Sequence, residues 1–415
     1  MRMSPDDPGQ PMDPDRVDLW DARLYSEGHP HALWRLLRAK APVHRQELQD
    51  GRRFWSVVRY ADVCRVLRDH EFFTSERGTL LTALGADDPA GGKMMAATDP
   101  PRHTALRESL GRVLSARAVE ARREVLLQPV DRLLTPLLTG EISDLAVAAM
   151  NFPMDFIGTL MGLPQEDWPR LAKLTTMAIA PHDASFQEGS APLTLLTVHH
   201  ELFEYFSRQL SARGGTPTDD LIGHLMSMRI DGSPPDHETI VYNCYSLILG
   251  ANVTTPHTIT GLVQALMDHP AAFRTAAADP SLVPGCVEEG LRWSSPASHF
   301  MRYTTRDVEI GGHTLREGSA LVAWLGSANR DEDVFADPYL FDIERRPNRH
   351  VAFGFGPHYC VGGALARISL RMLFERIFAR VERFEPAGEV RHLASNFVAG
   401  VKSMPVRAVP RIGSW

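Results

Sequence analysis

The sequence predicts a mainly helical fold with a smaller β portion, built as a single domain over residues 29–415. Apolar residues recur at helical spacing through most of the stretch from 102 to about 270. Short segments with Thr, Val and Ile, separated by glycine turns, follow residue 298 and are typical of antiparallel strands. The 415 residues show no internal repeat and no linker. We therefore expect one domain, although the length would allow two or three.

The elements before residue 102 follow from local patterns. In order, they are a polar lead-in (1–28), a short helix (30–40), a β-hairpin (strands near 43–48 and 53–58), a helix (60–69) and an irregular stretch (71–101). The lead-in has several aspartates and prolines and little to pack. Asp50-Gly51, a common turn signal, predicts the hairpin. An irregular stretch as long as 71–101 is usually functional or disordered.

Charge and composition narrow the class of protein. The net charge of −7 and the pI near 6.2 argue against a nucleic-acid binder, because such proteins usually carry a basic balance. No stretch approaches the roughly 20 consecutive apolar residues that span a bilayer, so no membrane association is expected. The N-terminal segment lacks the basic start and apolar core of a secretory signal, which favours a cytoplasmic location.

Cys360 is the most informative of four cysteines. All four are widely separated and form no C-x-x-C pair, which argues against a disulfide scaffold or a zinc site. Several glycines surround Cys360, and a helix is predicted directly after it. Glycines let the backbone approach the sulfur and a flat ligand across it, and a helix start favours an anion and lowers the pKa of a thiol. Such a thiolate is a good iron ligand.

Two other interpretations of the Cys360 segment were weighed on the residues alone. One is a glycine loop around a cysteine that is simply buried. The other is a dinucleotide-binding loop, since Gly354-x-Gly356 begins that pattern. Tyr359 stands in the place of its third glycine and no βα unit precedes it, which argues against the second interpretation.

Several motifs resemble those of the cytochrome P-450 family and run in that family's order from near 99 to 405. They are the haem-binding signature Phe-x-x-Gly-x-x-x-Cys-x-Gly, the Glu-x-x-Arg motif and the meander that follows it. The resemblance implies that the meander arginine completes a buried ionic triad with a structural role, whereas a Glu–Arg pair alone could be a surface pair. The matching residues are Phe353, Gly356, Cys360 and Gly362, then Glu289 and Arg292, then Arg345.

The resemblance implies a haem b cofactor (iron protoporphyrin IX) between a long central helix and the Cys360 loop, with the Cys360 thiolate as axial ligand. Buried haem propionates need cationic partners, and the resemblance places two histidines and two arginines there. Each of these four alone could be an ordinary surface residue. The expected cofactor-binding residues are His103, Arg107, Gly250, Ala251, Arg302, His350, Phe353, Gly354, Cys360 and Gly362.

The central helix departs from the family pattern at one position. Gly250 and Ala251 fill its small positions, and Thr254 matches the threonine that takes part in oxygen activation and proton relay. The resemblance therefore implies a catalytic role for Thr254. The usually acidic position, however, is Val253, which puts the family's ordinary proton-delivery route in doubt.

A proline close to Thr254 suggests a replacement for the missing acid. Pro256 has no N–H for the carbonyl of Asn252, which predicts a kink. The freed carbonyl and the Asn252 amide are then expected to hold water near Thr254, which makes Asn252 a second catalytic candidate. Alternatively, Thr254 and Thr255 only satisfy backbone groups. His257, one turn further on, is either a base facing the cavity or a hydrogen-bonded core histidine.

The expected reaction is hydroxylation or epoxidation of a small or medium natural-product intermediate with dioxygen and external electrons. The sequence has no flavin or iron–sulfur motif, so a ferredoxin and its reductase are the expected donors, with the arginines of 102–124, Arg367 and Arg371 as candidate docking groups. The substrate arrives either free or tethered to a carrier protein. Family placement assigns the pocket to loop 78–97, segment 177–192, Asn243, Leu247, Gly250, Ala297, His299, Phe300 and Phe397.

Three other functions remain open on the sequence. The same haem could catalyse a non-hydroxylating oxidation such as ring closure, C–C or C–N coupling or desaturation, which Val253 favours. It could belong to a peroxide-using enzyme, against which Thr254 argues. The protein could also be a haem-binding sensor or a catalytically silent haem protein.

Overall fold

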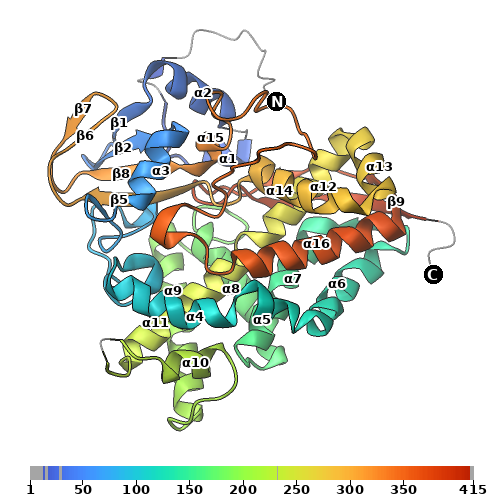
Figure 1. Cartoon of the computed structure of the whole chain (residues 1–415), viewed down its shortest axis with the longest axis horizontal. Coiled ribbons are helices and arrows are strands. Elements are labelled where there is room, and N and C mark those ends of the chain that lie inside the picture. Colours follow the sequence, from blue (N-terminus) through green and yellow to red (C-terminus); the bar gives the residue numbers. More distant parts are fainter. Residues whose placement is uncertain (1–12, 15–16, 28–29, 231, 412–415) are drawn as a thin grey trace.

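The structure is a computed structural model that describes residues 13–14, 17–27, 30–230 and 232–411 (Figure 1). It is mainly helical with a smaller β portion, which confirms the predicted class. The helices are α1 (Arg23–Glu27), α2 (His31–Lys40), α3 (Tyr60–Arg68), α4 (Arg102–Val113), α5 (Ala116–Glu120), α6 (Arg123–Leu137), α7 (Leu145–Leu160), α8 (Trp168–Ile179), α9 (Ala191–Ala212), α10 (Leu221–Ser227), α11 (His237–Asn252), α12 (Thr255–Asp268), α13 (Pro270–Ala278), α14 (Val283–Ser294), α15 (Leu325–Ala328) and α16 (Gly363–Arg380). The strands are β1 (Val43–Glu47), β2 (Arg53–Val57), β3 (Phe73–Thr74), β4 (Ile142–Asp144), β5 (His299–Thr304), β6 (Val308–Ile310), β7 (His313–Leu315), β8 (Ala320–Trp324), β9 (Val381–Pro386), β10 (Arg391–His392), β11 (Val401–Ser403) and β12 (Pro405–Pro410).

Five strands form a sheet at one end of the molecule, in the order β1-β2-β8-β5-β3 (left in Figure 1). The predicted hairpin is its first pair, with Val43 opposite Val57. Gly51 lies in the turn at a φ of 83°, a conformation that favours glycine. β8 pairs with β2 in parallel and with β5 antiparallel. This pairing fixes β5, which carries Arg302 and Phe300 to the cavity described below.

The N-terminal stretch packs more than its composition predicts. Val17, Leu19 and Tyr25 are buried in one apolar cluster with Trp324 of β8, and the Tyr25 hydroxyl donates to the Leu19 carbonyl at 3.0 Å. A few apolar residues in a polar segment are therefore enough to anchor it. The remainder of the predicted lead-in, residues 1–12, 15–16 and 28, lies outside the described residues.

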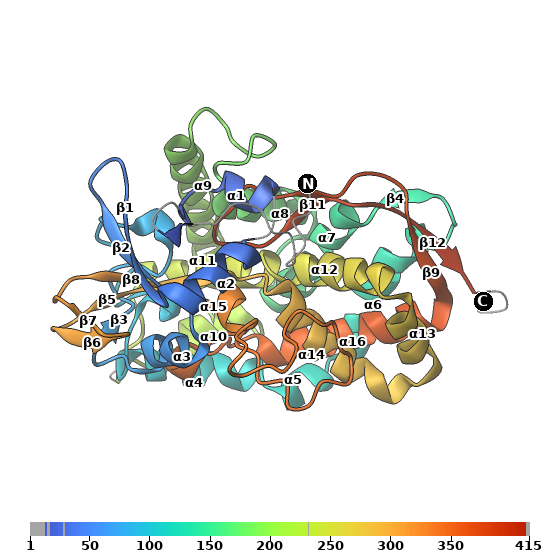
Figure 2. The same cartoon turned by 90° about the horizontal axis from the view of Figure 1, so that it is seen from above.

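Two large apolar cores organise the helical part. The first is formed mainly by α6, α7, α12, α14 and α16, and the second by α4, α8, α9, α10 and α11. Figure 2 shows α11 and α12 following one another through the middle of the molecule. These two helices hold the segment that the sequence identifies as the central helix.

The central helix is interrupted rather than only kinked. α11 ends at Asn252 and α12 begins at Thr255, with Val253 and Thr254 between them. The cause is the one expected from the sequence, because Pro256 near the start of α12 has no N–H to donate to the Asn252 carbonyl. Thr254 consequently lies at a helix junction, where its side chain is less constrained than inside a continuous helix.

Candidate functional site

A cavity of about 580 Å³ lies in the middle of the helical part. Its walls come from loop 78–97, α4, α9, α11, α12, β5, the segment 352–362 and the start of α16. Elements far apart in the sequence therefore converge on one space. Most of the sequence-predicted site residues lie in these walls: His103, Arg107, Leu247, Gly250, Ala251, Thr254, Ala297, Phe300, Arg302, Phe353, Gly354, Cys360, Gly362 and Phe397.

The loop before α16 holds Cys360 against the cavity. The Cys360 N–H donates to the carbonyl of Phe353 at 2.8 Å, which closes the loop on itself. Gly354 and Gly356 have φ angles of 75° and 71°, and a Cβ on Gly356 would lie 2.7 Å from Cα of Arg68. Only glycine tolerates both the positive φ and the close approach of Arg68 at position 356. The backbone of this loop, more than any side chain, therefore sets the position of the sulfur.

The electrostatics of Cys360 differ from the sequence-based expectation. Burial raises the pKa of its thiol, while the N–H of Gly362 and the charges of Arg107 and Arg367 act to lower it. The helix-start effect was expected to lower the pKa, but desolvation of the thiolate is larger here. The three lowering groups are those that would stabilise the thiolate once a cation is bound to it.

Two guanidinium groups face the cavity without an acidic partner. Arg107 and Arg302 form no ion pair within the described ranges, and burial lowers the pKa of both, that of Arg302 to about 10. The Nε2 atom of His103 is buried and also has no hydrogen-bond partner among these residues. Buried cations of this kind need an anion. The set fits the two propionates of a haem whose iron is bound by Cys360.

His358 was missed by the sequence reasoning and occupies the place expected for His350. The His358 ring lines the cavity with its centroid 4.3 Å from that of His103, and its Nε2 lies 3.8 Å from Asp99. Burial lowers the pKa of His103 to about 3 and that of His358 to about 4, so both rings are neutral near pH 7. The available signal was the position of His358 two residues before Cys360.

His350 itself does not line the cavity in this structure. Its Nδ1 accepts from the N–H of Ala352 at 3.3 Å, and its Nε2 donates to Glu288 at 3.1 Å. Glu288 also receives Arg367 at 2.7 Å. These contacts bind the start of the Cys360 loop to α14. The His350 ring is hydrogen-bonded to the Glu288 carboxylate. The expected contact of His350 with a propionate therefore has no support in this geometry.

The distal wall is formed by one face of α11 and the junction after it. Gly250, Ala251, Val253 and Thr254 all line the cavity. The Thr254 hydroxyl lies 3.5 Å from the Gly250 carbonyl, at the limit of a hydrogen bond. Asn252 points elsewhere: it is buried, and its Nδ2 lies 3.2 Å from the sulfur of Met154. The structure thus does not bring the Asn252 amide to Thr254.

Two residues predicted to contact substrate instead hold loop 78–97 in place. Asn243 accepts from the N–H of Met95 and donates to the carbonyl of Lys93, both at 2.9 Å. His299 accepts from the N–H of Leu81 at 3.2 Å. Neither Asn243 nor His299 lines the cavity, although the loop they bind does. Their influence on a substrate is therefore indirect.

His257 is a core histidine. It is buried, and its Nδ1 accepts from the N–H of Val401 at 3.2 Å. It is not among the residues that form the cavity wall. Of the two interpretations open on the sequence, the geometry favours the structural one.

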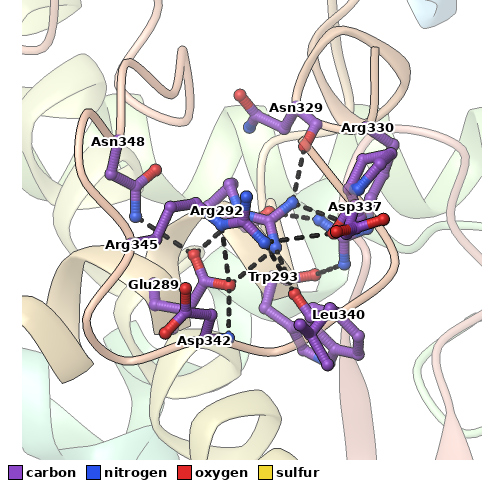
Figure 3. A network of polar contacts seen from close by, with 12 residues as sticks. Glu289, Arg292, Trp293, Asn329, Arg330, Asp337, Leu340, Asp342, Arg345 and Asn348 are labelled. Atoms are coloured by element: carbon purple, nitrogen blue, oxygen red, sulfur yellow. Dashed lines mark hydrogen bonds and ion pairs between the residues drawn. The ribbon is translucent and has the colours of Figure 1, made fainter. Parts of the chain in front are cut away.

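The Glu-x-x-Arg motif forms a buried network with the meander (Figure 3). Glu289 and Arg292 make two hydrogen bonds of 2.7 Å each, and Arg345 reaches the same carboxylate at 3.4 Å. Arg292 also donates to the carbonyls of Asn329 and Pro338 at 2.9 Å. The network joins α14 to the segment 329–348 that precedes the Cys360 loop.

Comparisons with known proteins agree with this geometry. The family model described as Cytochrome P-450 matches residues 155–396. Cytochrome P-450 NovI of Streptomyces niveus is 34% identical over 96% of this chain and 97% of its own length. Cyclomarin C epoxidase CymV of Salinispora arenicola is 32% identical over 91% and 95%. The crystal structure of P-450 OxyD, described as involved in the biosynthesis of vancomycin-type antibiotics, has a TM-score of 0.85 at 36% identity and covers 95% of this chain and 100% of that one.

No helix among the described residues is long and apolar enough to cross a membrane. Within the same part of the chain, no group of three or more His, Cys, Asp or Glu side chains could hold a metal ion by itself.

Proposed function

The chain belongs to the cytochrome P-450 family, and from that premise we propose that it hydroxylates or epoxidises a small or medium natural-product intermediate. It is a monooxygenase, with haem b and a cysteine thiolate as axial ligand. The substrate class is supported by two relatives, the cyclomarin C epoxidase CymV and OxyD, which takes part in the biosynthesis of vancomycin-type antibiotics. The observation that carries the proposal is the one cavity that brings together Cys360, the unpaired cations and Thr254.

Cys360 is assigned as the ligand because it is the only one of the four cysteines in the cavity wall. Burial raises the pKa of Cys64 to about 11 and that of Cys286 to about 12, and it raises the pKa of Cys360 as well, so the assignment rests on the place of Cys360 in the cavity wall. When bound, a thiolate-ligated haem supplies the activation of dioxygen. Arg107 and Arg302 would hold its propionates from α4 and β5.

Thr254 would hold a proton for oxygen activation on the distal side. Its hydroxyl lines the cavity and is bound only weakly by its own helix, so it is available to a ligand there. Val253 contributes an apolar surface and no proton. We infer that water admitted at the interruption between α11 and α12, or a polar group of the substrate, delivers protons to Thr254. The Asn252 carbonyl, which Pro256 cannot bond, is a backbone acceptor two residues from Thr254 for such a water.

The electron donors in this proposal are a ferredoxin and its reductase. The exposed Arg112 and Arg117, on α4 and α5, form no ion pair among the described residues and suit an acidic partner. Arg367 and Arg371, two other candidates from the sequence, share Glu288 at 2.7 Å and 3.6 Å. We therefore place the docking surface on α4 and α5 rather than on α16. A cytoplasmic location, where such donors are found, is part of the same proposal.

A second candidate function is oxidative coupling, cyclisation or desaturation on the same haem. The observation that favours it is Val253, because a slower proton supply would disfavour oxygen insertion. The two functions differ in the fate of dioxygen: insertion leaves one of its atoms in the product, and coupling or desaturation leaves none.

Turnover under ¹⁸O₂ tests the proposal. The haem-loaded protein would be combined with a ferredoxin, its reductase and NADPH, and screened against natural-product intermediates by mass spectrometry. We expect a product heavier by one ¹⁸O atom and no label from H₂¹⁸O. An oxidised product without either label would show that the reaction is coupling or desaturation and not oxygen insertion. Absence of any electron-dependent product across the screen would count against enzymatic function.

A further inference from the structure

Four aromatic rings line a part of the cavity that the proposed oxygen chemistry does not use. His199 and Phe203 come from α9, and Tyr242 and Tyr245 from α11. The centroid of Phe203 lies 5.2 Å from that of Tyr242 and 5.0 Å from that of Tyr245, both edge-on, and His199 lies 5.6 Å from Tyr245. We call these four residues the aromatic box.

The box lies along the same helix face as the distal wall. The cavity-lining residues of α11 and the junction recur at helical spacing from Tyr242 through Gly250 to Thr254. At a rise of 1.5 Å per residue, Tyr245 lies about 8 Å and Tyr242 about 12 Å along the axis from Gly250. A substrate of moderate length can therefore reach the box and the distal wall at once.

One carboxylate, that of Asp88 in loop 78–97, lines the same cavity as the box. Asp88 is half-buried in the cavity wall and accepts from the N–H of Ala90 at 2.9 Å. Burial lowers the pKa of His199, and the Asp88 charge partly offsets this effect. Burial raises the pKa of Tyr245, and Asp88 raises it further. The histidine of the box is thus neutral, and the negative charge of Asp88 lies outside the box in the same cavity wall.

Among the described residues, one cation lies over a ring of the box, that of Lys93. Lys93 lies 5.9 Å from the Tyr242 centroid, but it is paired with Glu238 and is not in the cavity wall. The hydroxyls of Tyr242 and Tyr245 have no hydrogen-bond partner among the described residues. The rings of the box therefore share the cavity wall with a carboxylate that forms no ion pair among the described residues.

Acidic residues are otherwise scarce in the cavity wall. Asp88 and its neighbour Asp87 are the only ones in the part of the chain described. Asp87 is 94% exposed at its side chain and lies 3.8 Å from Arg77, so solvent and that arginine screen its charge. A cationic group in the cavity thus has one favourable position, beside Asp88, whereas Arg107 and Arg302 would repel it elsewhere in the wall.

We propose that the aromatic box and Asp88 bind a positively charged amine of the substrate. Ring faces attract cations, and the attraction is strongest where water is excluded. This inference rests on the proposed function and narrows its substrate to a molecule with a protonated or quaternary amine, held roughly 8–12 Å along α11 from Gly250 of the distal wall. Asp88 then acts as counter-ion and the rings select the amine over a neutral group of equal shape.

Equilibrium dialysis of the haem-loaded protein against two matched probes tests the proposal. The probes are 4-phenylbutyl(trimethyl)ammonium and its neutral carbon isostere, 5,5-dimethylhexylbenzene. We expect the cation to bind about tenfold more tightly than the isostere. Asp88→Asn, whose amide oxygen can still accept from Ala90, should remove most of this preference. Tyr245→Leu should weaken it, whereas Tyr245→Phe should retain it.

Asp87→Asn is the matched control, because it removes the same charge one residue away and should leave the preference unchanged. Equal binding of the two probes by the unmodified protein would overturn the proposal. So would equal effects of Asp87→Asn and Asp88→Asn, which would indicate a general charge effect. If Tyr245→Leu does not fold, the comparison of Asp88→Asn with Asp87→Asn still tests the proposal. Binding requires no electrons or turnover, so its outcome is separate from that of the ¹⁸O₂ experiment.

Discussion

At the scale of single residues, Thr254 combines exposure to the cavity with weak attachment to its own backbone. Its hydroxyl is 3.5 Å from the Gly250 carbonyl, and α12 begins after it without a side-chain cap. Loss of this hydroxyl should therefore cost little folding stability. The same loss should affect the reaction, because proton transfer depends on groups placed at the reacting atoms.

Thr254→Ala should uncouple electron consumption from product formation. We expect NADPH oxidation to continue while the fraction of electrons recovered in product falls by about tenfold, with peroxide as the by-product. Thr254→Ser, which keeps the hydroxyl, is the control and should stay close to the unmodified protein. Coupling that is unchanged in Thr254→Ala would show that protons reach the oxygen without this residue.

His257 gives the protein a measurable dependence of stability on pH. Burial lowers its pKa from about 6.5 to about 4, so the unfolded chain binds a proton at a pH where the folded chain does not. This contribution to stability is present above pH 6.5 and is lost as the pH falls toward 4. In chemical denaturation between pH 6 and 4.5, His257→Gln should reduce the slope of unfolding free energy against pH by about 1 kcal/mol per unit. An unchanged slope would mean that His257 is already protonated in the folded state.

Sequence motifs correctly identified the residues that the backbone brings to the cavity. They were less successful in predicting which way individual side chains point. Cys360, Arg107 and Thr254 all line the cavity, since a loop or helix face carries them there. Asn252, the last residue of α11, turns toward Met154, and no motif specifies that direction.

At the scale of elements, loop 78–97 is held to the helical part by buried polar contacts rather than by regular structure. Its described conformation consists of turns and short 3₁₀ segments at Leu81–Ala83 and Met95–Ala97. Asn243 of α11 binds the backbone on both sides of residue 94. The sequence indicated an unusual stretch here, but such side-chain-to-backbone contacts over long sequence separations leave no periodic pattern to read.

Asn243→Ala should loosen this loop. The N–H of Met95 and the carbonyl of Lys93 would lose their partners, which costs about 1–3 kcal/mol for each buried group left unsatisfied. We expect a lower melting temperature and faster hydrogen exchange confined to residues 90–98. Ser246→Ala, one turn along α11, is a matched control without these contacts. If exchange in the loop is as slow as in the unmodified protein, another contact must hold it.

Most helices and strands could be predicted from the sequence, and the break in the central helix could be predicted in part. The hairpin β1–β2, helix α3 and helix α16 follow from turn signals and apolar spacing. Pro256 predicted a disturbed central helix, but the complete break over Val253 and Thr254 needed the structure. A proline fixes where a hydrogen bond is lost, whereas the surrounding packing decides how far the helix opens.

At the scale of the whole molecule, the network around Glu289 joins helix α14 to the chain that leads into the Cys360 loop. Glu289 and Arg292 are fully buried, and Arg345, Asn348 and the N–H of Asp342 complete the contacts to the carboxylate. The predicted fold is confirmed by the P-450 structures it resembles. The fold could be predicted from motifs that occur in the family's order. The aromatic box could not, because its four rings come from two helices that share no motif.

Glu289→Gln should destabilise the folded protein strongly. Arg292 would keep its charge in a buried site without a carboxylate, and breaking one partner of such a pair costs about 3–5 kcal/mol. We expect a lower denaturant midpoint and loss of haem at moderate temperature. Glu309→Gln, at the one exposed position of strand β6, is the control for removal of one carboxylate. Unchanged stability would mean that the network does not contribute net free energy.

The central claim is that Cys360 is the axial ligand of a haem in this cavity, and the carbon monoxide difference spectrum of the reduced protein tests it most directly. We predict a strongly red-shifted Soret band in the unmodified protein. The band should be lost in Cys360→Ser and retained in Cys64→Ser. A histidine-type band, or a red-shifted band that survives in Cys360→Ser, would contradict the account.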